Sequence, residues 1–216
     1  MKKLMYMILI FNLSSCISNK QTNDVLKKSN LTEIKKVDSL SKDEYELVND
    51  LLDTQLSSER YLGRGKKLEI ILIEEAGKHS WSIKGYEFCL NNKRSFGIGI
   101  SKWPIDSVQL KNLKNEFEKE EPYFWKMKDI KTYKVTISTD EEFRNIIKKA
   151  EYINKPEKII LYISRPYILN DNYGFIFFNS GSSIMGFNTI ERFYVLMKKE
   201  KGKWIKDGFY EDGVYH

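Results

Sequence analysis

Few residues of the sequence could form a nucleophile and base pair. A nucleophile becomes reactive when a base and an orienting group lie within hydrogen-bond reach. His79 and His216 are the two imidazoles, and Ser182 and Ser183 lie in the stretch NSGSSIMG (179–186). This stretch nearly matches the GxSxG pattern of a nucleophile elbow, but it lacks the second glycine. A hydrolase that uses one of these serines with His79 is therefore an alternative function and not the preferred one.

The stretch 179–186 is better explained as a connection between two strands. A nucleophile elbow leads into a helix, whereas the FNTIERFYVL that follows here predicts a strand. The stretch also lacks the lysine and the following helix of a phosphate-binding loop. Loops carried by a rigid sheet commonly hold binding residues. We therefore retain Ser182 and Ser183 as candidate binding residues in a loop.

Metal chemistry is not predicted. Metal ligation would draw on Asp207, Glu211, Asp212 and His216. A calcium loop needs oxygens at alternating positions around a central glycine, and DGFYEDGVYH does not provide them. A zinc site would need a second histidine or a usable cysteine pair. We expect neither a metal nor another cofactor.

Aromatic residues give a stronger indication of binding. Tyr123, Phe124 and Trp125 follow a proline in the polar setting EEPYFWKMK. Three consecutive side chains of an extended segment cannot all face one core, so at least one of them should be partly exposed. Aromatic rings offer flat contact surfaces to a protein or a glycan. Trp81 and Trp103 are candidates for extending this surface, and a loop that folds its rings onto the core is the alternative.

Three helices are predicted to support these side chains. Residues 41–56, a segment after Pro104 and residues 139–150 each repeat apolar side chains at helical spacing. Each segment begins with a side chain that can accept a hydrogen bond from an unpaired backbone N–H of the first turn. The predicted caps are Ser41 with Glu44, Asp106 or Ser107, and Thr139 with Glu142.

The predicted strands indicate an α+β fold. LEIILIEE (68–75) predicts a buried strand, residues 81–100 predict two short strands, and YKVTIS (133–138) alternates apolar and polar residues. The last third predicts an antiparallel meander with Gly202 at a left-handed turn position. Its strands are KIILYIS, YGFIFF, RFYVLMKK and KWIK. We expect a mainly antiparallel sheet that ends in this β-meander, with about three helices packed on one face.

Composition and charge limit the partners. The 216 residues carry a formal net charge of +6, from 30 lysines and only 6 arginines against 30 acids. The lysines alternate with acids, as in KNLKNEFEKEE, instead of forming a stripe, and nucleic-acid recognition depends on the arginine fork. We therefore predict no nucleic-acid partner. A hydrophobic content of 41% is enough to bury a core.

The opening stretch MKKLMYMILIFNLSSC joins a positive start, an apolar run and a cysteine. Lys2 and Lys3 precede the run 4–13, which one asparagine interrupts. The run is too short to span a bilayer, which takes about 20 apolar residues. LSSC (13–16) resembles the lipobox of bacterial lipoprotein signal peptides. The resemblance implies that the chain is cut before Cys16, lipidated on its sulfur and acylated, as with palmitate, at the new N-terminus.

This resemblance divides the chain into three parts. Residues 1–15 would be the signal peptide, residues 16–40 a lipidated cysteine with a polar tether, and residues 41–216 a single α+β domain. More than one acyl chain gives stable attachment to a bilayer, whereas one chain binds only marginally. Cys89 then has no thiol partner, which excludes an internal disulfide. The alternatives are an ordinary cleaved signal with a coincidental cysteine and a buried N-terminal helix.

A binding function in the cell envelope is the prediction that follows. The segment SRPYILNDNYGFIFF…FYVLMKKEKGKW resembles the closing meander of uncharacterised secreted and lipid-anchored bacterial proteins, which implies no activity. We predict a membrane-anchored, non-catalytic lipoprotein that binds a protein or glycan. ISNKQTND after Cys16 has no acidic cluster, which favours the periplasmic face. Besides the hydrolase, the alternatives are a periplasmic inhibitor or immunity-type protein and a structural spacer.

Overall fold

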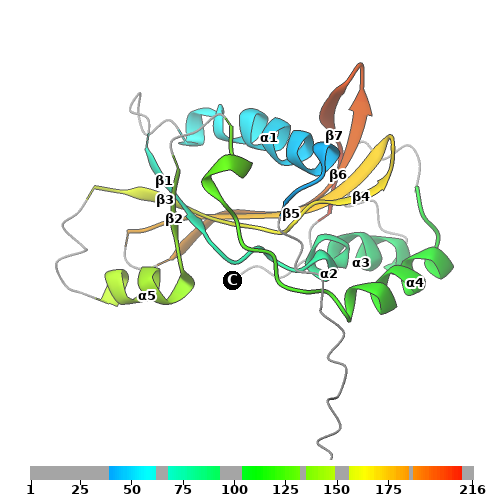
Figure 1. Ribbon diagram of the computed structural model, residues 1–216, viewed down its shortest axis with the longest axis horizontal. Coiled ribbons are helices and arrows are strands. Elements are labelled where there is room, and N and C mark those ends of the chain that lie inside the picture. Colours follow the sequence, from blue (N-terminus) through cyan, green and yellow to red (C-terminus); the bar gives the residue numbers. More distant parts are fainter. Residues whose placement is uncertain are drawn as a thin grey trace, which may run out of the picture. The chain divides into compact units, whose positions relative to one another are not determined.

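A seven-stranded sheet runs through the centre of the protein (Figure 1). The computed structural model describes residues 39–61, 68–92, 104–131, 135–148, 156–184 and 187–210. The strands lie in the order β2-β1-β3-β5-β6-β7, with β4 paired to β5. Their bounds are β1 (Glu69–Ile73), β2 (Val135–Ser138), β3 (Lys158–Ile163), β4 (Tyr167–Asn170), β5 (Tyr173–Ser182), β6 (Asn188–Glu200) and β7 (Lys203–Tyr210).

The sheet is parallel at one edge and antiparallel over the rest. β1 pairs in parallel with both β2 and β3, and helical segments separate these three strands along the chain, as parallel connections require. β3, β5, β6 and β7 are antiparallel neighbours in sequence order, and β4 forms a hairpin with β5. The prediction of an α+β fold with a mainly antiparallel sheet and a C-terminal meander is confirmed. Gly202 has a positive φ of 78° in the last turn, as predicted.

In the described part of the chain, five α-helices accompany the sheet, and the three predicted ones are present. The helices are α1 (Lys42–Leu56), α2 (His79–Ser82), α3 (Lys84–Asn92), α4 (Ser107–Phe117) and α5 (Asp140–Lys148), with short 3-10 turns η1 (Glu59–Tyr61) and η2 (Met127–Asp129). The capping box of α1 pairs Ser41 with Glu44, and Asp106 caps the start of α4. At the start of α5, the Glu142 N–H donates to Thr139 Oγ1 at 3.0 Å, and the Thr139 N–H donates to Glu142 Oε2 at 3.0 Å.

The prediction of two strands over residues 81–100 is wrong for its described part. Residues 79–92 form α2 and α3, and residues 93–100 lie outside the described part of the chain. Ile83 and Tyr86 are buried in one apolar cluster, and Leu90 packs against it. These three side chains recur at the spacing of a helix face. The short alternating pattern suggested the two-residue period of a strand, whereas the buried side chains follow the spacing of a helix.

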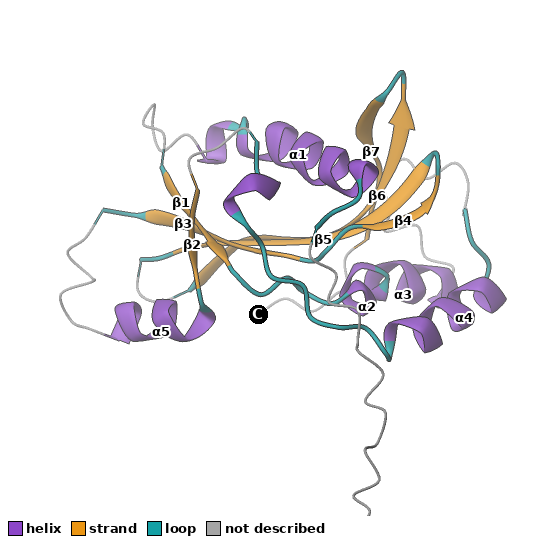
Figure 2. Ribbon diagram, in the orientation of Figure 1, coloured by secondary structure: helices purple, strands orange, loops and turns teal. Residues whose placement is uncertain are grey.

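Helices cover both faces of the sheet, and not one face as the sequence suggested (Figure 2). α1 lies on one face, whereas α2, α3, α4 and α5 lie on the other. The reason is the composition of the central strands, whose apolar side chains point to both faces of the sheet. On β1, Ile70 and Leu72 join the α1 cluster, while Ile71 and Ile73 join Phe143 of α5. A strand that is apolar on both sides must be covered on both sides.

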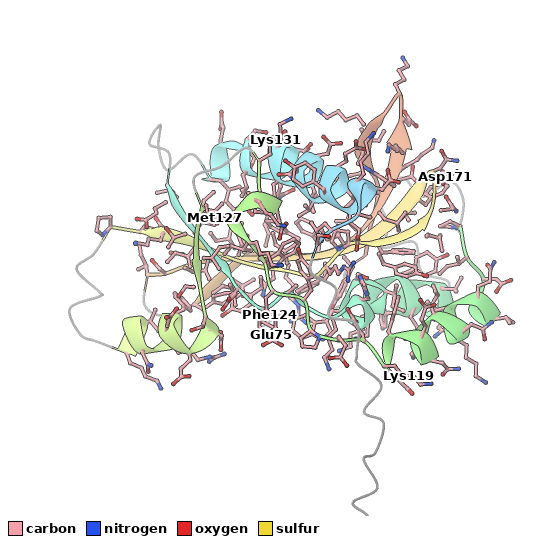
Figure 3. All side chains as sticks on the ribbon, viewed as in Figure 1. Glu75, Lys119, Phe124, Met127, Lys131 and Asp171 are labelled. Atoms are coloured by element: carbon pink, nitrogen blue, oxygen red, sulfur yellow. The ribbon has the colours of Figure 1, made fainter. Side chains whose placement is uncertain are left out.

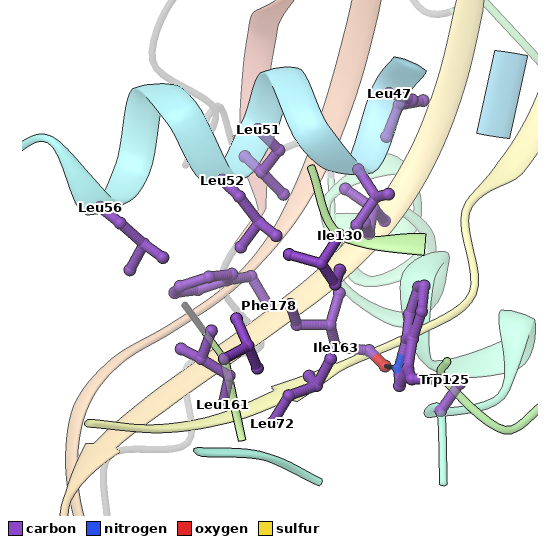
Figure 4. Packing of buried hydrophobic residues seen from close by; sticks show 14 of the residues in the cluster. Leu47, Leu51, Leu52, Leu56, Leu72, Trp125, Ile130, Leu161, Ile163 and Phe178 are labelled. Carbon is purple, nitrogen blue, oxygen red and sulfur yellow. Dashed lines mark hydrogen bonds between the residues drawn. The ribbon is translucent and has the colours of Figure 1, made fainter. Parts of the chain in front are cut away.

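The larger core lies between α1 and the sheet (Figure 4). Leu47, Leu51 and Leu52 of α1 are at most 1% exposed, and Leu52 lies over Phe178 of β5. Trp125, from the segment between α4 and β2, is 2% exposed and belongs to the same cluster. Burying one side chain of this size contributes about 1.5–3 kcal/mol. This face therefore provides much of the stability of the domain.

Asn49 of α1 fastens the segment 123–131 to this core. Its Nδ2 donates to the Asp129 carbonyl oxygen at 2.9 Å, and its Oδ1 accepts from the Lys131 N–H at 2.7 Å. The segment also donates from the Trp125 N–H to the Glu74 carbonyl oxygen at 2.8 Å. Figure 3 shows Phe124 beside Glu75, with which it forms an isolated antiparallel β-bridge. One buried amide thus positions an extended stretch that has little regular structure.

Replacing Asn49 by alanine should destabilise the domain by about 2 kcal/mol, because it leaves a buried carbonyl and a backbone N–H without their partner. Urea unfolding measures this loss. Thr54→Ala, at an exposed position of the same helix, is the matched control and should change the unfolding free energy by less than about 0.5 kcal/mol. Equal stability of the two variants would contradict the role given to Asn49.

Candidate functional site

A pocket of about 530 Å³ lies on the sheet face opposite α1. Its floor is formed by β3, β5 and β6, and its walls come from α2 with the start of α3 on one side and from α5 on the other. This volume falls in the range of small-molecule sites, about 300–1,000 Å³. The pocket is therefore the candidate binding site of the domain.

The floor consists of side chains that strand alternation sends to the same face. Tyr162 of β3, Asn179 of β5 and Arg192 of β6 are direct neighbours across three paired strands. Phe177 and Tyr194 form the next pair along β5 and β6, with ring centroids 5.1 Å apart. Directly opposed residues of antiparallel strands have their Cβ atoms close together. The register of the sheet thus places a phenol, an amide and a guanidinium in one row.

Trp81 forms the wall on the α2 side. Its ring meets Phe177 edge-on, with centroids 5.8 Å apart, and 43% of the residue remains exposed. Gly77 makes room for the indole, because a Cβ at that position would lie 2.6 Å from Trp81 Cε3. Lys84, one turn further along the chain, also lines the pocket. This wall therefore combines an aromatic surface with a positive charge.

α5 supplies the opposite wall. Phe143 is 1% exposed and packs against Ile71 and Ile160, which holds the helix on the sheet. Arg144 and Ile147 of the same helix also line the pocket. Helix residues that are four positions apart lie on the same face, so Phe143 and Ile147 share one face of α5. The helix thus turns its apolar stripe inward and carries Arg144 at the edge of that stripe.

Asp140 connects α5 to β3 and orients two lining residues. It accepts hydrogen bonds from Arg144 Nε and from Tyr162 Oη, the latter at 2.6 Å. Desolvation by burial raises the pKa of Asp140, but the bonds from Arg144 and Tyr162 outweigh it and the net pKa is lowered. Burial and the bond to Asp140 raise the pKa of Tyr162, so its hydroxyl stays protonated as a donor. These two hydrogen bonds to Asp140 hold the Arg144 side chain and the Tyr162 ring at the pocket.

Phe187 closes the pocket from the connection between β5 and β6. Its ring lies over Gly181, where a Cβ would come within 2.6 Å of Phe187 Cζ. The ring also meets Tyr162 at right angles, with centroids 5.3 Å apart. Only glycine at position 181 leaves this space, so the sheet itself determines where the Phe187 ring lies.

The pocket contains one of the aromatic residues that the sequence suggested. Trp81 lines it, and Trp103 and Cys16 lie outside the described residues. Phe124 is 40% exposed, which confirms that one ring of the 123–125 run stays accessible. Its neighbours Tyr123 and Trp125 are buried at 3% and 2%. The three consecutive rings therefore do not form a joint binding surface.

Tyr123 and Trp125 have internal partners. Tyr123 Oη donates to Asp129 Oδ2 at 2.7 Å, and Trp125 Nε1 donates to the Ile163 carbonyl oxygen at 3.4 Å. Their rings meet edge-on with centroids 5.5 Å apart. The expectation that these two rings contact a ligand is corrected: they close the core beneath α1, because alternation turns them to the opposite side from Phe124.

Ser182 and Ser183 do not lie on an open loop, since β5 continues through Ser182. Ser182 is 7% exposed and Ser183 is 2% exposed. Ser182 Oγ donates to Glu157 Oε1 at 2.6 Å, and Ser183 Oγ accepts from the Lys158 N–H at 3.0 Å. The loop predicted over 179–186 is therefore wrong for 179–182. Both hydroxyls secure the end of β5 against the start of β3.

His79 lies far from these serines. Its Nδ1 is 3.0 Å from Glu120 Oε1, its Nε2 is 3.0 Å from the Pro166 carbonyl oxygen, and its ring contacts Tyr167. Tyr167 pairs with Phe175, and Ser182 follows seven residues later on β5, which is about 23 Å at roughly 3.3 Å per residue. The structure does not bring His79 and the serines together as a catalytic pair.

The floor residues Tyr162, Asn179 and Arg192 were missed by the sequence analysis. Their best signal was a polar residue inside an otherwise apolar strand, such as Asn179 after YGFIFF or Arg192 before FYVLM. Buried strands rarely hold such groups without a specific contact. That these three meet in one row depends on the pairing register, which a single strand does not reveal.

Neither a candidate metal site nor a membrane-spanning helix is found in the described part of the chain. Within the described ranges, no group of three or more His, Cys, Asp or Glu side chains is placed to hold a metal ion. None of the helices in the described part of the chain has the length and apolar character needed to cross a bilayer. No protein family model matches the sequence, and no curated protein or solved structure is significantly similar to it.

Acid should weaken the connection between α5 and β3 through Asp140. Because its pKa is lowered in the folded protein, its ionised form stabilises the fold above the unfolded-state pKa of about 3.9, and this stabilisation is lost as the pH falls through the lower folded value. The difference in unfolding free energy between the wild type and Asp140→Asn should be constant from about pH 7 to 5 and shrink below about pH 4. Urea unfolding across this range measures it, and a constant difference down to about pH 3 would contradict the assignment.

Proposed function

We propose that the protein is a lipid-anchored lipoprotein of the bacterial cell envelope whose folded domain binds a small molecule in the pocket between α2 and α5. The observation that carries the binding function is a pocket of about 530 Å³ with aromatic walls and cationic side chains. The anchor is inferred from the sequence alone. The two parts of the proposal are independent, and each has its own experiment.

The anchor is supported by the order of features in the first 16 residues. A basic start and a short apolar run lead into LSSC, which ends at Cys16, as in lipoprotein signal peptides. The polar residues 17–40 that follow would act as a flexible tether with a root-mean-square reach of about 25–30 Å. A tether of this reach would keep the domain beside the membrane and leave its pocket open to soluble ligands.

Binding at the pocket is favoured over binding at residues 123–125. A recognition surface needs accessible aromatic area, and in the 123–125 run only Phe124 is substantially exposed. At the pocket, Trp81 keeps 43% of its surface exposed and contacts Phe177. Rings that line a concave site contribute more to affinity than a single ring on a convex surface. The protein or glycan partner suggested by the sequence is replaced here by a small ligand.

The anchor predicts that the full-length protein partitions into the detergent phase of Triton X-114 and that Cys16→Ser moves it to the aqueous phase. Acyl chains on Cys16 are the physical cause, because each buried CH₂ favours the apolar phase by about 0.8 kcal/mol. Cys89→Ser is the matched control, since Cys89 is the only other cysteine, and it should partition as the wild type does. Detergent-phase partition of Cys16→Ser would refute the anchor.

The pocket predicts that the domain binds an uncharged naphthalene probe, N-phenyl-1-naphthylamine, whose fluorescence rises in apolar sites. Trp81→Ala should weaken this binding by about tenfold, because it removes an aromatic wall. Phe124→Ala removes an exposed ring outside the pocket lining and should leave the affinity within about twofold of the wild type. The reverse ranking of the two variants would return the binding site to residues 123–125.

A further inference from the structure

The charges that line the pocket are all positive. Lys84, Arg144 and Arg192 line it, and among the described residues no Asp or Glu belongs to the lining. A concave site with low-dielectric walls focuses the field of such charges and concentrates ligands of the opposite sign. The lining therefore favours an anion over a neutral or cationic ligand of the same shape.

Among the described residues, Asp140 forms an ion pair with Arg144 and offsets its charge, so the positive charge offered to a ligand is left to Lys84 and Arg192. Asp140 accepts from Arg144 and Tyr162 at the edge of α5. Glu191 precedes Arg192 on β6 but points to the opposite face, where Tyr61 and Gln55 donate to it. Within the described part of the chain, Lys84 has no ion-pair partner, and it lies on an exposed position at the pocket. Lys84 can thus face a ligand without breaking an internal bond.

Asn179 in the pocket floor has an acceptor oxygen that is not paired with a donor among the described residues. Among the described residues, its side-chain oxygen Oδ1 is buried and has no hydrogen-bond partner. A buried polar atom without a partner is costly, and a ligand that donates an N–H or O–H there recovers the cost. Asn179 lies between Tyr162 and Arg192 in the cross-strand row. A donor on the ligand would therefore lie close to the cationic side chain.

The walls select the shape of the ligand. Trp81 and Phe177 meet edge-on, at 85°, and Phe187 stands at 90° to Tyr162. Rings that meet edge-on are not stacked face to face, and a planar apolar group can stack on a ring face that stays accessible. The partial exposure of Trp81 leaves such a surface uncovered.

We propose that this pocket binds a planar aromatic anion that also carries an N–H or O–H donor, with Lys84 and Arg192 facing the anion, Asn179 accepting from the donor, and Trp81 stacking on the ring. The inference rests on the proposed binding function and adds the chemical class of the ligand. It is independent of the lipid anchor.

Three probes of similar size test each feature separately. Indole-3-acetate has the ring, the carboxylate and the N–H, 3-methylindole lacks the carboxylate, and naphthalene-1-acetate lacks the N–H. Calorimetry with the purified protein should rank indole-3-acetate first, with each of the other two about five- to tenfold weaker, as expected for one hydrogen bond or charge contact. Equal affinity for 3-methylindole and indole-3-acetate would overturn the anion, and equal affinity for naphthalene-1-acetate would overturn the donor.

Two variants assign the contacts. Lys84→Gln should weaken indole-3-acetate by about fivefold and leave 3-methylindole unchanged, and Lys111→Gln, an exposed lysine of α4 outside the pocket, should change neither. Asn179→Leu should remove the preference for indole-3-acetate over naphthalene-1-acetate. Because Lys84 is exposed, its variant tests the charge even where a floor variant does not fold. Binding of N-phenyl-1-naphthylamine without any preference among indole-3-acetate, naphthalene-1-acetate and 3-methylindole would refute this inference alone. No binding of any probe would refute the pocket function itself.

Discussion

The burial of both faces of the central strands is the constraint on which the rest of the structure depends. β1, β3 and β5 alternate apolar side chains to either side, so each face needs a cover. The long helix α1 covers one face together with the segment 123–131. The other face is covered by two separate groups, α2 to α4 and α5 (Figure 1). The pocket lies where these two groups approach the same strands without meeting, and its floor is therefore a part of the sheet that neither group covers.

Strand alternation also separates charges that are adjacent in sequence. Glu191 and Arg192 are neighbours on β6, but Glu191 faces α1 and Arg192 lines the pocket. On the α1 side, Glu191 belongs to a buried polar cluster in which Tyr61 Oη also lies 2.7 Å from Ser180 Oγ. Burial and the bond to Glu191 raise the pKa of Tyr61, which keeps its hydroxyl protonated as a donor to the carboxylate. The acid is thereby satisfied within the core, and the positive character of the pocket persists on the other face.

Local signals in the sequence predicted local structure well. The capping boxes at Ser41 and Thr139, the glycine turn at Gly202 and the C-terminal meander depend on residues close in the chain, and all four are present. Residues 81–92 were assigned the wrong period, because a short apolar run fits a strand or a helix until its packing partner is known. The pocket was missed for a related reason: Tyr162, Asn179 and Arg192 meet only through the register of three strands.

The two faces of the sheet thus differ in whether their buried polar groups are paired within the fold. On the α1 face the polar groups of Asn49 and Tyr123 are paired within the fold, so a change there acts on stability. On the pocket face the Asn179 side-chain oxygen lacks a partner among the described residues, and Trp81 is only partly covered. Unused hydrogen-bonding capacity and uncovered aromatic surface lower the stability of the domain on its own and are recovered only when a ligand fills the site. A ligand that fits should therefore stabilise this domain through its contacts on the pocket face.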